Sequence, residues 1–231
     1  MLVVICLLVG GATFWMGPRL AHLAFIDARR GEPFTVLDFV RVSPEQALEA
    51  RYQYPLAGLF ASEGGRVLAD YRQVHVVEGR RRDEWQRLNV LHMSRAQDLA
   101  QIMTSAPYRL LQRGADSVES MKLGSYDTAS SDWRPGLVLW AAEVDADTRD
   151  PCTSLRARVV DGPGRVVWDT QTQPFEGQAR WSRVLAVDFA SVDEALAWLR
   201  VKTMETERAV VNAGVRDLSL SVYERVGAGG Y

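Results

Sequence analysis

The 231-residue chain has little cysteine and little histidine, and both shortages exclude classes of protein. Two cysteines, Cys6 and Cys152, are too few for a disulfide framework. The three histidines, His22, His75 and His92, form no H-x-x-H or H-E-x-x-H spacing, and no C-x-x-C occurs, so we expect no metal site. We expect no haem ligation by His75 or His92 either, because neither lies on a predicted helix. No cofactor is therefore expected.

The chain also lacks an excess of charge of either sign. Its 27 basic and 29 acidic residues give a net charge of −2, without the basic excess that binding to a phosphate backbone requires. The motifs G-x-G-x-x-G, Walker A and G-x-S-x-G are absent, so nothing predicts nucleotide binding or serine hydrolysis. A hydrophobic content of 47% is typical of a globular protein.

One segment lacks charge altogether: residues 1–16, "MLVVICLLVGGATFWM". A helix of this length spans roughly 24 Å, and "LAHLAFI" extends it if Arg19 reaches to the headgroups. We therefore expect a transmembrane anchor at residues 1–26. A cleaved signal peptide and a buried core helix are the alternatives, although no basic residue precedes the run and no A-x-A follows it.

Charge and small residues around this segment predict its orientation and its partner. The arginines near the segment all follow it, which places the folded part in the cytoplasm, on a single-pass protein of a bacterial inner membrane. Gly10 and Gly11, close to Trp15, form a patch small enough for another transmembrane helix to approach. The expected partners are a lipid bilayer and a larger integral membrane protein.

The hexapeptide "GRVLAD" at residues 65–70 returns as "GRVVWD" at 164–169. Around the first copy, the patterns predict strands at 34–42, 66–77, 85–93 and 119–127 and helices at 43–65 and 94–114. The second copy repeats this order, with strands at 136–144, 164–177, 181–189 and 217–226 and helices at 150–160 and 191–211. Capping boxes are predicted at Ser43, Ser94 and Ser191. Each copy therefore reads β-α-β-β-α-β, the ferredoxin-like order.

Individual residues of the two copies match at offsets between 96 and 99. The matches are Gly65 with Gly164, Trp85 with Trp181, Arg87 with Arg183, Ser94 with Ser191, Leu123 with Leu220 and Tyr126 with Tyr223. The chain is thus interpreted as a tandem duplication. The predicted parts are an anchor at 1–26, a linker at 27–33, repeat 1 at 34–127, a linker at 128–135, repeat 2 at 136–226 and a tail at 227–231.

With "SPEQALEARYQYPLAGLFASEGGRVLA", "VVEG" and "TSAPYR", the first copy resembles small uncharacterised bacterial domains of the dimeric α/β-barrel superfamily. The second copy resembles them loosely. The resemblance implies an α+β fold in which two ferredoxin-like repeats face their sheets together as an intrachain pseudo-dimeric barrel. It does not choose a function, because the superfamily includes monooxygenases, isomerases and haem-handling members.

Three polar residues of the predicted strands are candidate catalytic groups. Strand alternation and the repeat relate His92 to Asp188, which would make a base and its orienting carboxylate if both faced the barrel interior. Asp38 interrupts an apolar face, so it needs a partner, and Arg87 or another strand arginine is the expected one. The alternative is that Asp38 is an acid of raised pKa in a pocket.

Two further features are candidates for binding a partner. Arg80, Arg81 and Arg82 lie at a predicted hairpin tip, which is either a solvated turn or a contact with anionic lipid or an acidic partner. Trp133, in the linker between the repeats, is either a core residue or an interface anchor.

No constellation of these residues predicts a reaction. We therefore expect a membrane-anchored, non-catalytic accessory or assembly subunit that binds a larger membrane complex through its helix and its cytoplasmic domain. The alternative is a small-substrate enzyme of monooxygenase or isomerase type, or a small-ligand binder, with a pocket between the two repeats. A pocket lined by His92, Asp188 or Asp38 would favour an enzyme, and a flat exposed apolar patch would favour the accessory subunit.

Overall fold

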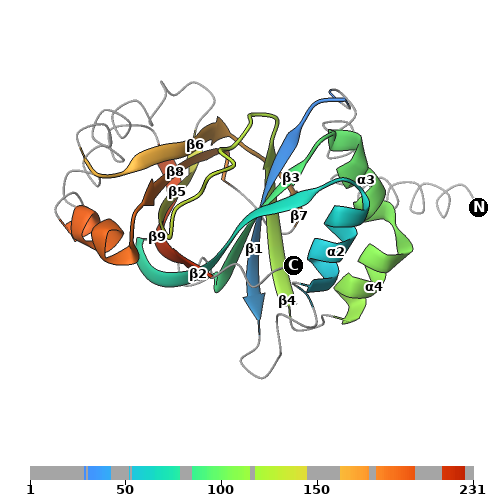
Figure 1. Cartoon of the computed structure of the whole chain (residues 1–231), viewed down its shortest axis with the longest axis horizontal. Coiled ribbons are helices and arrows are strands. Elements are labelled where there is room, and N and C mark those ends of the chain that lie inside the picture. The colour runs from blue at the N-terminus through green and yellow to red at the C-terminus, as the bar shows by residue number, and fades with distance from the viewer. Residues whose placement is uncertain are drawn as a thin grey trace, which may run out of the picture.

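In the described part of the chain, nine antiparallel strands form a single curled sheet in the order β6-β8-β5-β9-β2-β3-β1-β4-β7, with helices on its outer side (Figure 1). This is a computed structural model of the chain. It describes residues 29, 31–42, 52, 54–78, 85–114, 118–144, 162–176, 181–200 and 215–226.

One half of the sheet comes from the first sequence copy, in the order β4-β1-β3-β2. Its strands are β1 (Phe34–Val42), β2 (Arg66–Glu78), β3 (Arg87–Met93) and β4 (Val118–Ser125). Its helices are α2 (Tyr54–Ser62), α3 (Ala96–Thr104) and α4 (Ala106–Gly114), which lie together on one face of this half (Figure 1).

The other half comes from the second copy, in the order β9-β5-β8-β6. Its strands are β5 (Gly136–Val144), β6 (Arg165–Gln171), β7 (Gln173–Glu176), β8 (Arg183–Phe189) and β9 (Val215–Arg225). Residues 192–200 are helical and cover the outer face of this half.

Two connections join the halves. Residues 66–72 of β2 pair with β3, while residues 71–78 of the same strand pair with β9 of the other half. At the far edges, Thr172 alone separates β6 from β7, and β7 pairs with β4. The two edges of the curled sheet therefore meet at Thr172.

The predicted fold class is wrong in two respects. The two copies do not lie as separate sheets facing one another, because β2·β9 and β4·β7 pairing makes their strands one continuous sheet. A transmembrane helix is not part of the described fold, since no helix among the described residues is long and apolar enough to cross a bilayer. The anchor predicted at residues 1–26 lies outside the described residues.

The repeated hexapeptide has the same structural role in both halves. A Cβ on Gly65 would lie 2.5 Å from Met93 Sδ, and one on Gly164 would lie 2.8 Å from a ring carbon of Phe189. Both glycines are thus required by close packing. Each is followed by an irregular register, between Val67 and Ala69 in β2 and at the corresponding place in β6.

Two of the predicted matches between the copies are wrong by one residue. Thr35 of the first half and Leu137 of the second half occupy equivalent positions. Thr35 pairs with Ser125 and Leu137 pairs with Tyr223, so the residue equivalent to Tyr223 is Ser125, not Tyr126. The predicted match of Leu123 with Leu220 is shifted by one residue in the same way. Leu123 lies in the core between the halves, whereas Leu220 lies in the core under the second half's helix. A shift of one residue moves a strand side chain to the opposite face.

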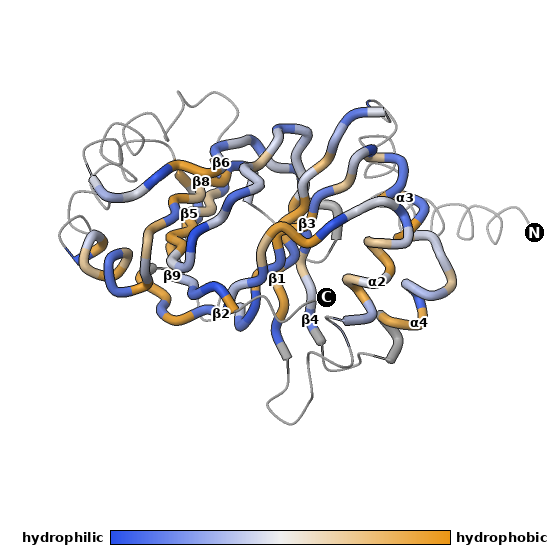
Figure 2. The backbone as a smooth tube through the Cα atoms, viewed as in Figure 1, coloured by the Kyte–Doolittle hydropathy of each residue, from blue (hydrophilic) through white to orange (hydrophobic). Residues whose placement is uncertain are grey.

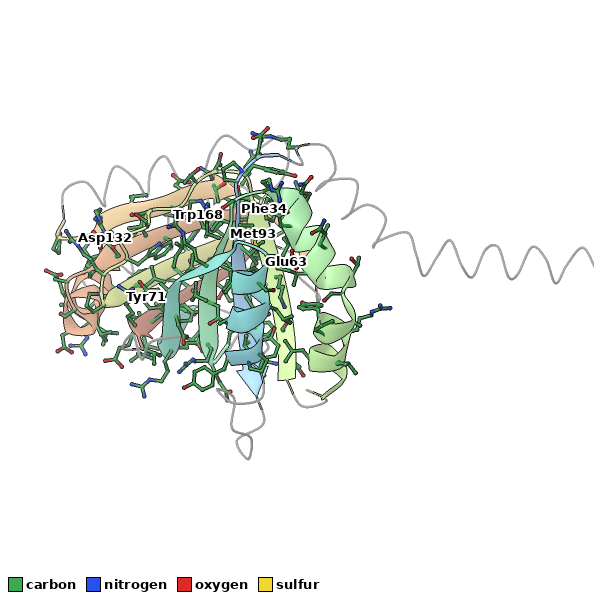
Figure 3. All side chains as sticks on the ribbon, turned by 45° about the vertical axis from the view of Figure 1, so that its right-hand side comes forward. Phe34, Glu63, Tyr71, Met93, Asp132 and Trp168 are labelled. Carbon is green, nitrogen blue, oxygen red and sulfur yellow. The ribbon has the colours of Figure 1, made fainter. Side chains whose placement is uncertain are left out.

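The hydrophobic core has three parts. An inner cluster takes residues from both halves, including Phe39, whose ring centroid lies 6.1 Å from that of Trp85 and 5.5 Å from that of Trp181. Each half also has one outer cluster between its strands and its helices. Phe34 and Met93, which are cross-strand partners, belong to the outer cluster of the first half (Figure 3). Figure 2 shows hydrophobic stretches on β5, β6 and β8 of one half, on β1 and β3 of the other, and on α2.

The helix predicted at 94–114 is two helices. α3 ends at Ser105, whose side chain oxygen then accepts a hydrogen bond from the backbone N–H of Tyr108 and caps α4. Pro107 has no N–H to continue α3 and is tolerated in the first turn of α4. The Ser94 capping box is wrong, because Arg95 occupies the N-cap and Ser94 donates to Gly64 O. Ser191 does accept a bond from Glu194 N–H, at 3.1 Å, and Ser43 lies outside the described residues.

Candidate functional site

The structure does not join His92 and Asp188. Asp188 is fully buried and accepts hydrogen bonds from Arg165 Nη2 at 2.6 Å, Arg165 Nε at 3.1 Å and the backbone N–H of Arg134 at 3.0 Å. His92 is half-buried opposite Thr35, and no hydrogen bond or ion pair links it to Asp188. The acid-base pair suggested by the repeat is therefore not formed, since Asp188 instead anchors the linker between the halves.

Burial lowers the pKa of His92 below its ordinary value, and the nearby positive charge of Arg66 lowers it further. In the second half, hydrogen bonding to the Asp188 carboxylate raises the pKa of Arg165 above its ordinary value. At neutral pH, His92 is thus a neutral ring beside a permanent cation, and Arg165 is permanently charged.

Asp38 has a partner, but not the predicted one. Its carboxylate lies 3.1 Å from Lys122 Nζ on β4 and accepts hydrogen bonds from Asn89 at 3.1 Å and from the Tyr52 hydroxyl at 3.4 Å. Lys122 in turn donates to Tyr52 and to Ser120. Arg87, the expected partner, pairs with Asp70 instead.

This Asp38–Lys122 cluster is closed. Asp38 is 0% exposed and Lys122 is 1% exposed, and they lie between the sheet and the helices of the first half. At the equivalent positions, the second half has Trp140 and Leu220. An ion pair that is fully buried, hydrogen-bonded and replaced by apolar residues in the other copy is a packing feature.

The other predicted contact residues are less informative. Trp133 is 1% exposed and lies in the inner core with its ring 6.2 Å from Tyr71, which leaves no surface for a partner. Its indole N–H donates to Ser130 O. Six residues lie outside the described part of the chain: Gly10, Gly11, Trp15, Arg80, Arg81 and Arg82.

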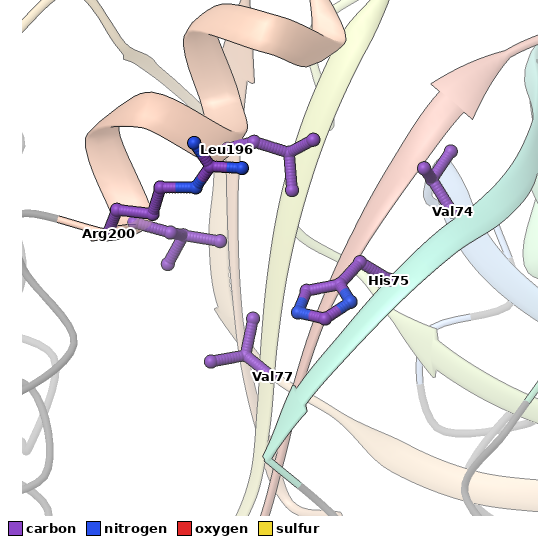
Figure 4. Close-up of a pocket in the computed structure, with 6 residues that line it drawn as sticks. Val74, His75, Val77, Leu196 and Arg200 are labelled. Carbon is purple, nitrogen blue, oxygen red and sulfur yellow. The ribbon is translucent and has the colours of Figure 1, made fainter.

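A hollow of about 270 Å³ lies where the two halves meet. We call it the junction groove and define it by its lining residues, Val74, His75 and Val77 of β2 and Leu196, Leu199 and Arg200 of the helix at 192–200. Figure 4 shows His75 and Val77 of the strand facing Leu196 and Arg200 of the helix across one space, with Val74 to one side.

The local fold of β2 creates this groove. The strand crosses from β3 to β9, and its register on β9 is irregular between Gln73 and His75 and again between Val76 and Glu78. Irregular pairing bends a strand and redirects its side chains. Val77 thereby packs against the outer core of the second half, while Val74 is 43% exposed at the opening.

A second hollow, of about 280 Å³, adjoins the first and shares Val74 and His75 with it. Its other lining residues are mostly polar: Arg41, Gln73, Val76 and Gln86. The described residues that line the two hollows include two arginines and one histidine and no acidic residue. Their side-chain charge is therefore positive or neutral.

Sequence reasoning missed the junction groove because its walls come from different copies. His75 was placed in a hairpin, and nothing in the local pattern indicates that its strand extends onto β9. One signal was available: "VHVV" at 74–77 has apolar residues on both sides of the strand, which indicates burial or contact on both faces.

Comparisons with known proteins support the fold. No protein-family model matches the chain, and no curated protein sequence does either. Among solved structures, an anthrone oxidase-like protein is similar, with a TM-score of 0.55 and 10% identity over 87% of this chain and 94% of that one. A chlorite dismutase from Candidatus Nitrospira defluvii gives a TM-score of 0.46 and 11% identity over 84% and 92%.

A smaller structure, a protein of unknown function from Rhodopseudomonas palustris, covers 47% of this chain and 92% of its own length, with a TM-score of 0.39 and 16% identity. The structure neighbours are chlorite dismutase-like and anthrone oxidase-like proteins and small uncharacterised domains, which are members of the dimeric α/β-barrel superfamily. The resemblance inferred from the sequence is therefore confirmed at the level of the fold.

The expected function is corrected by the same findings. The expectation of a membrane-anchored, non-catalytic accessory subunit is contradicted, because the similar solved structure with a TM-score of 0.55 is an anthrone oxidase-like protein. No membrane-spanning helix is found among the described residues. The alternative hypothesis, a pocket between the two copies, agrees better with the junction groove.

Proposed function

We propose that this protein binds a small, mostly apolar molecule in the junction groove. The observation that carries the proposal is the groove itself: a concave space at the junction of two halves, with four aliphatic side chains and two nitrogen-bearing ones. Small-molecule sites have this character, with an apolar lining and a few polar groups that orient the ligand.

Binding is favoured over catalysis by the composition of the groove. A general base usually needs a second group that orients it or stabilises the charge formed on it. Among the described residues that line the groove, His75 is the single candidate base and no carboxylate is present. The likeness of the fold to the anthrone oxidase-like protein does not choose a reaction.

A groove-blocking variant tests the proposal. Val74 lines both hollows and is 43% exposed, so Val74→Trp should obstruct the groove at little cost to stability. Leu110→Trp is the matched control, because Leu110 is 65% exposed on α4 and lines neither hollow.

The measurement is ligand-observed NMR with a library of small apolar and amphipathic molecules against the full-length protein. We expect molecules that bind the natural protein and Leu110→Trp alike, and that no longer bind Val74→Trp. A library without binders, or binders that Val74→Trp retains, would show that the groove is not the site.

A further inference from the structure

We infer that the molecule bound in the junction groove is an amphipathic anion, such as a small carboxylate, with its apolar part on Val77, Leu196 and Leu199 and its charged group at Arg200 and His75. This inference rests on the proposed function and specifies its ligand. The chain itself has a net charge of −2, so a positive groove does not follow from its overall composition.

Among the residues that the structure describes, Arg200 stands without a partner. Arg200 makes no hydrogen bond or ion pair with any residue that the structure describes. By contrast, most arginines of the described strands pair with carboxylates. These pairs are Arg41 with Glu119, Arg72 with Glu224, Arg87 with Asp70, Arg165 with Asp188 and Arg183 with Asp169. A guanidinium at the edge of an apolar groove is a natural partner for a carboxylate.

The groove around that cation combines an apolar wall with a polar ring. Leu199 is 3% exposed and belongs to the outer core of the second half, so the apolar wall is rigidly packed. His75 faces the same space from β2, and its ring nitrogens add a hydrogen-bond donor (Figure 4). A ligand that satisfies both surfaces needs an apolar body and a negatively charged end.

The adjoining hollow extends the positive surface. Arg41 lies with its guanidinium 4.9 Å above the ring of Trp85 and pairs with Glu119, which holds it in place. Gln73 is held by hydrogen bonds from its amide to Ser221 and Tyr223. These neighbours add an ion-paired arginine and neutral polar groups, and no acidic residue is among the described residues that line this hollow.

Three probes of equal length test the inference on the full-length protein: octanoate, octan-1-ol and octylammonium. By calorimetric titration, the natural protein should bind octanoate most tightly and octylammonium least tightly. Arg200→Gln should weaken octanoate binding by about five- to tenfold, since one charge-assisted contact at a partly exposed site is lost, and should leave octan-1-ol unchanged. Arg200→Glu should reverse the order of the two ions.

Arg109→Glu is the control for long-range charge. Arg109 is an exposed residue of α4, and its replacement by glutamate makes the same change of charge as Arg200→Glu, away from the groove. It should preserve the order of the three probes. Equal affinity of the natural protein for octanoate and octan-1-ol, or an order that Arg200→Glu leaves intact, would overturn the inference.

The Val74→Trp variant separates the two levels of failure. If it abolishes the binding of all three probes while their affinities do not depend on charge, the groove is the site and the anion inference is wrong. If it leaves all three affinities unchanged, the proposed function is wrong and the inference fails with it.

Discussion

Arg87 on β3 donates a hydrogen bond to Asp70 on β2 over 2.7 Å, and the two side chains are only 10% and 5% exposed. The second half of the sheet has the same ion pair between Arg183 and Asp169. Each aspartate is the last residue of the repeated hexapeptide, and each arginine follows a buried tryptophan by two positions. The duplication has therefore kept a buried ion pair as well as a glycine.

Removing the cation of this pair should be costly. Arg87→Met leaves the carboxylate of Asp70 buried without its cation and should lower the free energy of unfolding by about 3–5 kcal/mol. Arg72→Met is the control, because Arg72 pairs with Glu224 at the surface, where a pair contributes about 0–1 kcal/mol. Urea denaturation measures both, and equal losses would contradict the burial argument.

The Asp38–Lys122 cluster should be replaceable as a whole but not in part. Lys122→Met should lower the free energy of unfolding by about 3–5 kcal/mol, because Asp38 would remain charged in the core. The double variant Asp38→Leu/Lys122→Met should lose less than Lys122→Met alone, since Trp140 and Leu220 already fill the equivalent places in the second half. If the double variant is the less stable one, the cluster is more than an ion pair enclosed by packing.

Two glycines of the first half should respond to alanine with opposite signs. Gly58 lies inside α2, where a methyl group added to its Cα would have no other atom within 4 Å, so Gly58→Ala should raise the free energy of unfolding by about 0.5–1 kcal/mol. Gly65→Ala should lower it by about 1–3 kcal/mol, because the methyl group would meet Met93 Sδ at 2.5 Å and Phe60 O at 2.9 Å. Thermal denaturation of both variants checks the signs, and a stabilised Gly65→Ala would refute the packing explanation of the repeat.

His92 should make the stability depend on pH. Its pKa is lowered on folding by burial and by Arg66, so the unfolded chain takes up the proton first, near the ordinary value of 6.5. Stability should therefore fall as the pH drops through and below that value, where the unfolded state binds more protons than the folded state. His92→Gln should reduce the loss of stability between about pH 7.5 and about pH 5, measured by urea denaturation. An unchanged loss would mean that other groups carry the pH dependence.

Local patterns predicted strands such as β1 and β5 well, because each of them is a short, largely apolar run. The sequence also predicted the duplication, since Gly65 and Gly164 begin hexapeptides whose packing requirement is strict. It could not predict the partner of Asp38. Lys122 reaches that carboxylate across the β1·β4 pairing, and register between strands far apart in sequence is not written in either strand alone.

Local sequence patterns could not predict the junction groove for a related reason. Its residues are brought together by β2·β9 pairing, in which His75 pairs with Val222, a residue farther along the chain than one whole repeat. The comparison of the copies was wrong by one residue at the ends of β4 and β9. Tyr126 and Tyr223 are the same residue type, but their side chains lie on different faces of the sheet. Chemistry at a junction between copies depends on such long-range contacts.

The most direct test of the central claim is methyl NMR of the full-length protein, with labelled valine and leucine, during a titration with octanoate. Our account predicts shifts of the methyl signals of Val74, Val77, Leu196 and Leu199, while those of Leu88 and Val90 in the inner core stay unchanged. Shifts confined to the inner-core signals, or no shifts at all at saturating octanoate, would contradict it.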